Sequence, residues 1–459
     1  MRRHPLLVCG LVLAALVAGL YSEFLIGERF FHFGDHLNLY LPLRTLVVRA
    51  VERGAFPLWA PELMAGLPVH ADPQAALFYP PVWLHALFDY PVACLILHVL
   101  HVWGAGMGVV LLGRAMGLGW GASLFSGATF AAAGYFMVQS VHPNLVHTTA
   151  YVPWVLAALR RWATREGWAP LAWGALAWGL ALLAGGVQIA YYALLPLSTM
   201  GAYWTLTQPR GSAKEKAKKL AGALSMGLWG AGLAAVLLIP LWELAPLTIR
   251  SQGLTLRVAA SYGLGEGQWL QLLSPHLFGL PGETPNTGPS NFWETYGYVG
   301  VLPLAAALAA LGYLALDAWA WIRQRLGSYE AQVEDPRRSG DDPQLTVDQR
   351  GKGLPLEMSL WVAMGFIAWF VAAGAASPVD LLRPLHTHLP FMSSFRAHGR
   401  LTWLVALAVS LLAGWALNRF VGSSFLGARR HGGTSCSSAG EQALPFLAGL
   451  AVVAIGEVF

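Results

Sequence analysis

The sequence predicts an all-α protein that crosses a membrane many times. Hydrophobic residues make up 56% of the chain and charged residues only 12%, whereas a typical soluble domain has about 45–50% apolar and about 25% charged residues. The mean hydropathy is +0.52. The 459 residues also contain repeated apolar runs near 20 residues, the length that crosses a hydrocarbon core of about 30 Å. A disordered chain is excluded because disorder requires low hydrophobicity and high charge.

We expect about eleven transmembrane helices in one domain, residues 1–459. The spans lie near residues 5–26, 88–113, 118–138, 145–160, 168–186, 189–207, 220–245, 297–322, 357–376, 401–420 and 443–459. The first run is long for a signal peptide and no small-residue cleavage site follows it, so we expect a retained helix. The sequence stops inside or just after the last run, which suggests a fragment of a longer chain.

Lysine and arginine residues predict the orientation. If the N-terminus is cytoplasmic and the spans alternate, most of the 29 basic residues, including every lysine, fall in cytoplasmic segments, as the positive-inside rule requires. The net charge of +5 therefore reflects membrane orientation, and we expect no nucleic-acid partner. The three cysteines form neither a disulfide framework nor a zinc spacing.

This topology leaves three long segments outside the cytoplasm, at residues 27–87, 246–296 and 377–400, and a polar cytoplasmic loop at 323–356 that we interpret as a flexible linker. The first outer segment is the most informative. Residues 43–53 are amphipathic and suit the membrane interface, and the Pro- and Trp-rich residues that follow suggest an ordered cap on the bundle.

The first outer segment also carries a resemblance. It contains GDHLNLYLPLR at 34–44 and GAFPLWAPELMAGLPVHADPQAALFYPP at 54–81. These strings resemble the YfhO family of bacterial membrane proteins, and a long first outer loop with an acidic residue after helix one resembles the GT-C glycosyltransferase superfamily. Further matches are GGVQIAYY at 185–192, SPHLFG at 274–279 and FRAHGR at 395–400.

The resemblance implies a GT-C-like sugar transferase in the bacterial inner (cytoplasmic) membrane. Its donor would be a polyprenyl-phosphate-linked sugar, its acceptor a component of the cell envelope on the extracytoplasmic side, and membrane lipids would surround it. Family members are often longer at the C-terminus, so we expect that this chain lacks the C-terminal part that those members have.

Asp35 is the predicted catalytic base. A carboxylate can take the proton from an acceptor hydroxyl as that hydroxyl attacks the sugar. An ordinary Asp pKa of about 3.9 leaves the group ionised at neutral pH. The alternative is that Asp35 caps the helix that follows it. Related superfamily members often carry two acidic residues here, whereas His36 follows Asp35, which puts a metal-dependent mechanism in doubt.

Asp72 is a second candidate catalytic carboxylate, and the alternative is a simple turn at Asp72-Pro73. His36, His70 and Gln74 are predicted to contact substrate. If a divalent metal ion is used as a cofactor, Asp35, His36 and Asp72 are the expected ligands.

Outer arginines are candidates for the donor phosphate, which arginine grips with two hydrogen bonds. Arg396 and Arg400 are four residues apart, so on a helix they would face one site; the alternative is contact with lipid headgroups. Gln188 follows a glycine pair, and its amide suits a sugar, although a tight loop with interfacial aromatic residues fits the same pattern.

Two other functional classes stay open. A transporter or flippase for a lipid-linked sugar predicts ionisable residues in mid-span and a repeat between halves. The predicted spans contain few ionisable residues, and the sequence shows no repeat. The other class is a non-catalytic membrane scaffold.

Overall fold

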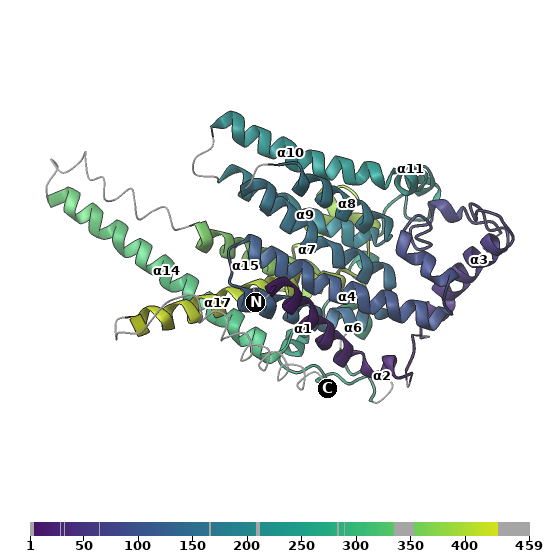
Figure 1. The fold of residues 1–459 in the computed structure, drawn as a ribbon, viewed down its shortest axis with the longest axis horizontal. Coiled ribbons are helices and arrows are strands. Elements are labelled where there is room, and N and C mark those ends of the chain that lie inside the picture. Colours follow the sequence, from purple (N-terminus) through teal and green to yellow (C-terminus); the bar gives the residue numbers. More distant parts are fainter. Residues whose placement is uncertain are drawn as a thin grey trace.

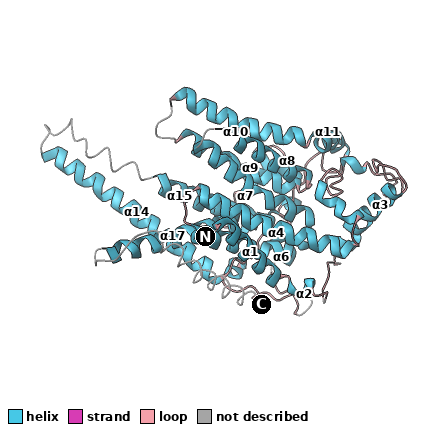
Figure 2. Ribbon diagram, viewed as in Figure 1, coloured by secondary structure: helices cyan, strands magenta, loops and turns pink. Residues whose placement is uncertain are grey.

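The computed structural model describes residues 4–27, 29–31, 33–63, 65–164, 167–207, 212–281, 284–288, 290–334 and 353–429. These residues form helices and loops without a β-strand; one isolated bridge joins Ala60 and Leu67 (Figure 2). Helices satisfy all backbone hydrogen bonds within one segment, which is what a lipid surrounding requires.

The long helices run alongside one another in one bundle (Figure 1). They are α1 (Pro5–Leu20), α4 (Tyr90–Ala115), α5 (Trp120–Ala131), α7 (Pro143–Thr164), α8 (Ala169–Leu183), α9 (Val187–Leu206), α10 (Ala213–Leu233), α14 (Val301–Glu334), α15 (Gly353–Ala373) and α17 (Thr402–Arg429). Helix α4 packs against α7 and α5, and α17 packs against α14, α15 and α5.

The described helices include five that are long and apolar enough to cross a membrane, at Tyr90–Ala115, Trp120–Val141, Val301–Arg323, Leu356–Ala376 and His398–Gly422. A sixth would form if α10 and the helix after it, which bend by 75°, act as one span. The predicted count of eleven is therefore not confirmed. Helices α1 and α8 have only 16 and 15 residues, short of the roughly 20 that a span needs, and residues 443–459 lie outside the described residues.

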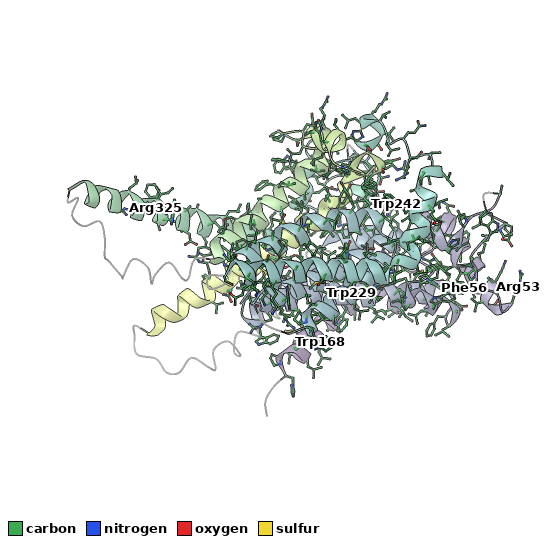
Figure 3. The ribbon with its side chains drawn as sticks, turned by 90° about the horizontal axis from the view of Figure 1, so that it is seen from above. Arg53, Phe56, Trp168, Trp229, Trp242 and Arg325 are labelled. Carbon is green, nitrogen blue, oxygen red and sulfur yellow. The ribbon has the colours of Figure 1, made fainter. Side chains whose placement is uncertain are left out.

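The surface of the bundle is apolar. Trp229 and Trp242 are 72% and 70% exposed, and Figure 3 shows them on the long side of the molecule, between Arg325 at one end and Arg53 with Phe56 at the other. Contiguous exposed apolar surface of this kind needs lipid around it. The chain is therefore a multi-pass membrane protein.

The predicted loop at residues 323–356 falls between the candidate spans Val301–Arg323 and Leu356–Ala376. Helix α14 continues past its apolar span to Glu334 and α15 begins at Gly353; residues 335–352 lie outside the described residues. The apolar pattern ends near residue 322, but the polar residues after it, which include Arg323, Gln324 and Arg325, are good helix formers and extend α14.

Residues 27–87 form a folded segment at one end of the bundle (Figure 1). It contains a π-helical turn (His36–Tyr40), α3 (Leu41–Glu52) and a 3-10 helix (Pro80–Ala86). The amphipathic residues predicted to lie in the membrane interface form α3, but its buried Val47 packs on Ala60, Val69, Ala75 and Leu77 of the same segment. The apolar face of α3 is thus used within the protein.

The start of α7 and the turn between α8 and α9 contact this segment and hold it against the bundle. Asn144 Nδ2 donates a 2.9 Å hydrogen bond to the Pro73 carbonyl. Gly185 has φ +83°, and a Cβ added there would overlap the same carbonyl. Glycine is needed here both for its conformation and for the close backbone approach.

Replacing Gly185 with alanine is therefore expected to lower the thermal stability of the purified protein by about 2 kcal/mol or more, because strain and overlap add. Gly117 is the matched control, since it has φ +95° with open space around it; alanine there should cost only about 1 kcal/mol. Thermal unfolding of both variants in one detergent measures the difference. Equal destabilisation would show that the Pro73 contact contributes nothing.

Candidate functional site

A chain of polar side chains joins five segments that are far apart in the sequence. In the predicted topology all of them lie at the outer ends of helices. Its members come from the start of the π-helical turn, from the 3-10 helix before α7, from the start of α9, from α13 (Phe292–Thr295) and from the 3-10 helix His398–Leu401, and they are Asp35, Gln139, His142, Gln188, Glu294 and Arg400.

Asp35 sits at the exposed end of this chain. Its Oδ2 is 3.4 Å from His142 Nε2, and its side chain is 45% exposed against 14% for His142. Asp35 precedes the π-helical turn but makes no side-chain capping hydrogen bond. The alternative of a helix cap is therefore not what the structure shows, and the carboxylate faces His142 and solvent.

Gln139 fixes the orientation of the His142 ring. Gln139 Nε2 donates a 2.7 Å hydrogen bond to the Trp293 carbonyl, so its Oε1 faces His142 Nδ1 at 2.8 Å. An amide oxygen can only accept, and His142 Nδ1 must therefore carry a proton. The other ring nitrogen, Nε2, points at the carboxylates of Asp35 and, at 4.0 Å, Glu294.

Asp35 is held in its ionised form. The hydrogen bond with His142 lowers the pKa of Asp35, burial opposes it, and the charges of His142 and Arg400 lower it further, so that the net pKa is below its ordinary value. The carboxylate is a proton acceptor at neutral pH.

Glu294 and Arg400 form a two-point ion pair deeper in the chain. Arg400 Nε and Nη2 donate to the two carboxylate oxygens of Glu294 at 2.7 and 2.6 Å, and the side chains are 19% and 10% exposed. Burial raises the pKa of Glu294, but the hydrogen bonds and charge of Arg400 outweigh it, and the net pKa is lowered. This geometry fixes both groups as charges.

Gln188 is buried at the start of α9 and continues the chain. Arg400 Nη1 donates to Gln188 Oε1 at 3.1 Å, and Gln188 Nε2 donates to the Tyr192 hydroxyl at 2.8 Å and to the Arg396 carbonyl at 2.6 Å. The amide is thus fully used within the protein, and it links α9 to the segment before α17.

Arg396 and Arg400 do not share a helical face, so that prediction is wrong. Ala397 between them has φ +57°, which breaks any helical turn before His398 and sends the two side chains in different directions. Arg400 turns inward to Glu294, whereas Arg396 is exposed and lies over the Tyr262 ring at 5.7 Å. The pKa of Arg250 is lowered, mainly by burial and further by the positive charges of Arg396 and Arg400.

Two of the site residues predicted around Asp72 make hydrogen bonds to nearby main-chain groups. Asp72 Oδ1 accepts a 2.9 Å hydrogen bond from the main-chain N–H of Gln74, so the turn expected at Asp72-Pro73 is present. Burial raises the pKa of Asp72. His70 Nδ1 donates to the Leu58 carbonyl at 2.9 Å. The Gln74 side chain is exposed.

His36 is buried and paired through both ring nitrogens. Nε2 donates to the Ser140 carbonyl at 2.8 Å, which leaves Nδ1 to accept from the Tyr90 hydroxyl at 2.7 Å. No ring lone pair remains to coordinate a metal. Across the described residues, no group of three or more His, Cys, Asp or Glu is placed to hold a metal ion, and the donor set of Asp35, His36 and Asp72 does not fit one.

Three members of the polar chain were not among the site residues predicted from the sequence. Glu294 and His142 are visible only as one acid and one histidine among several in the outer segments, and Gln139 directly follows the apolar run 130–138. An uninterrupted apolar stretch that contains a single amide, as residues 130–138 followed by Gln139 do, is the one feature that could have drawn attention to it.

Comparisons with known proteins give structural likenesses alone. No protein-family model matches the chain, and no curated protein sequence matches it. The crystal structure of the oligosaccharyltransferase of Archaeoglobus fulgidus in the apo form is similar at 11% sequence identity with a TM-score of 0.49. The match covers 99% of this chain and 56% of that chain. This chain therefore spans little more than half the length of the archaeal enzyme.

Proposed function

We propose that the chain is a membrane glycosyltransferase that moves a sugar from a polyprenyl-phosphate-linked donor to an acceptor on the extracytoplasmic side of the membrane, with Asp35 as the general base. The observation that carries the proposal is a half-exposed, ionised carboxylate held at the end of a buried polar chain. The resemblance of the first outer segment to the YfhO family supports it and supplies the substrate class.

The proposed reaction is an inverting transfer. The Asp35 carboxylate takes the proton from an acceptor hydroxyl, and the oxygen of that hydroxyl forms a bond to the anomeric carbon. The bond between the anomeric carbon and the phosphate oxygen breaks on the opposite face, and polyprenyl phosphate leaves with its electron pair. Asp35 then returns its proton to water.

Residues of the outer segments are proposed to contact the substrates. Arg250 and Arg396 would hold the donor phosphate, and Arg250 is itself positioned by a 3.1 Å hydrogen bond to the Ser394 carbonyl. Tyr191 and Phe395 have ring centroids 5.2 Å apart and offer an aromatic surface to a sugar. The exposed Gln74 completes this set. Asp72, with its raised pKa, is proposed to contact the acceptor.

Transfer by purified protein tests the proposal. The chain is reconstituted in lipid nanodiscs and incubated with polyprenyl-phosphate sugars that carry a radiolabel, together with a membrane extract as the acceptor source. Label is expected to move from the lipid to an acceptor in a protein-dependent manner. In a parallel reconstitution into sealed vesicles, donor that crosses the bilayer unchanged would instead indicate a flippase. No transfer of label with any donor would contradict the proposal.

His142 is proposed as the positioning residue for Asp35. In His142→Phe the largest cause that lowers the Asp35 pKa is lost, so that pKa rises. The reaction needs ionised Asp35, so activity is lost as pH falls through this pKa; the acid limb of kcat/KM is therefore expected to move to higher pH, with about a 10-fold lower rate.

His142→Gln is the matched control, since its amide can still donate to Asp35 and should bring the acid limb back toward that of the wild type. A pH profile from about 3.5 to 8 distinguishes this from a structural role, which would lower the rate without moving the limb. An acid limb that stays in place in His142→Phe would remove His142 from the proposal.

A further inference from the structure

A cavity lies beneath α3, between the π-helical turn, the 3-10 helix Pro80–Ala86, α4 and the start of α7. Its empty volume is about 360 Å³, including space open to solvent. The polar side chains that line it include Tyr40, Arg44, His85, Tyr90 and His147. No aspartate or glutamate is among its described lining residues.

Arg44 brings a buried positive charge to this cavity. Its side chain is 5% exposed. Two of its N–H groups donate to main-chain carbonyls, those of Ala75 and Gln74, the latter at 3.2 Å. No carboxylate of the described residues lies within salt-bridge distance of it.

The charge of Arg44 is therefore compensated by main-chain dipoles in contact and, beyond salt-bridge distance, by the charge of Asp72. A guanidinium has five N–H donors in a fixed fork, so three remain after the two carbonyls are served. A buried charge without a counter-charge in direct contact is unfavourable. Burial lowers the pKa of Arg44, which reports the same cost.

His85 supplies a second unused group on the wall. Its Nδ1 is buried and has no hydrogen-bond partner among the described residues, and its ring stacks on Tyr90 with centroids 5.2 Å apart. Burial lowers the pKa of His85 to about 3, so the ring is neutral and can present one N–H at Nδ1. The wall thus offers a cation and an N–H donor with no competing acid.

We propose that this cavity binds an oxyanion of the phosphate class, with Arg44 as its counter-charge and His85 as a second donor. The site is separate from the polar chain, because Asp35, His142, Glu294 and Arg400 do not line it. It does not rest on the proposed glycosyl transfer. A phosphate here would complete the charge balance under α3 and fix the first outer segment to α4. Free phosphate and a lipid phosphate share this chemistry.

Thermal unfolding in nanodiscs made only of phosphatidylcholine tests the proposal, with inorganic phosphate as the probe at constant ionic strength. The unfolding temperature of the wild type is expected to rise and saturate with phosphate, because a ligand that binds only the folded state stabilises it. Arg49→Gln, an exposed arginine on the same helix, should respond as the wild type does. Arg44→Gln should not respond, and His85→Phe should need at least about 10-fold more phosphate.

Two further arms keep the test decisive. In Arg44→Lys the charge is retained without the fork, so the chain should fold and need more phosphate even if Arg44→Gln does not fold. Nanodiscs that contain phosphatidic acid reveal the source: a lipid phosphate in the site would stabilise the protein in advance and abolish the response to free phosphate. An unfolding temperature that responds to neither probe, or that responds equally in the wild type and Arg44→Lys, would overturn the proposal.

Discussion

Replacing Asp35 with asparagine is expected to lower the rate of sugar transfer by about 10²- to 10⁴-fold, the usual contribution of a general base. The amide keeps the shape of the side chain but cannot accept the proton. The fold should be nearly unaffected, because Asp35 is 45% exposed and makes no capping hydrogen bond; loss of an exposed pair costs about 0–1 kcal/mol. The measurements are kcat and the unfolding temperature on the same preparation.

Asp89→Asn is the matched control. Asp89 precedes α4, is exposed and also makes no capping hydrogen bond, so the same change of charge occurs at one end of the bundle without touching the polar chain. Its transfer rate should equal that of the wild type. Full activity in Asp35→Asn would exclude this carboxylate from the mechanism, and an equal loss in both variants would point to surface charge instead.

The helical character of the chain could be predicted from its sequence, but the number of spans could not. An apolar run in lipid has no alternative to a helix, since every backbone group must be satisfied internally. Whether a helix crosses the bilayer depends on its length and on what covers it. Helix α8 is apolar throughout but has 15 residues, and α7 buries Asn144, His147 and Thr148 among its neighbours, which sequence-based counting treats as outer-facing polarity.

The candidate site was predictable where one local string carries it. Asp35 stands in a distinctive motif, and the turn at Asp72 follows from its own sequence. The partners of Asp35 were not predictable, because Gln139 and Glu294 meet only through the packing of segments 155 residues apart. Arg396 and Arg400 show the opposite error: a periodicity argument assumes a helix, and the positive φ of Ala397 is a property of the loop that packs there.

Removing one partner of the buried ion pair should be the most destabilising change in the polar chain. The Glu294 side chain is only 10% exposed. Arg400→Met removes the guanidinium that binds both of its carboxylate oxygens. Loss of one partner of a buried pair costs about 3–5 kcal/mol of unfolding free energy. Arg383→Met is the control, because the Arg383–Asp380 pair has the same chemistry with an arginine 69% exposed, and it should cost about 1 kcal/mol or less.

The double variant Arg400→Met with Glu294→Gln separates a lost attraction from a stranded charge. With no carboxylate left to bury, it should be more stable than Arg400→Met alone. Its pH dependence should differ as well. The pKa of Glu294 is lowered from its ordinary value of 4.5, so the wild type has this stabilisation above pH 4.5 and loses it as the pH falls through the lowered pKa. The double variant lacks that loss. If Arg400→Met and the double variant were equally stable at every pH, Glu294 would be neutral in the folded Arg400→Met variant, and the whole cost of losing Arg400 would be the lost attraction rather than a stranded charge.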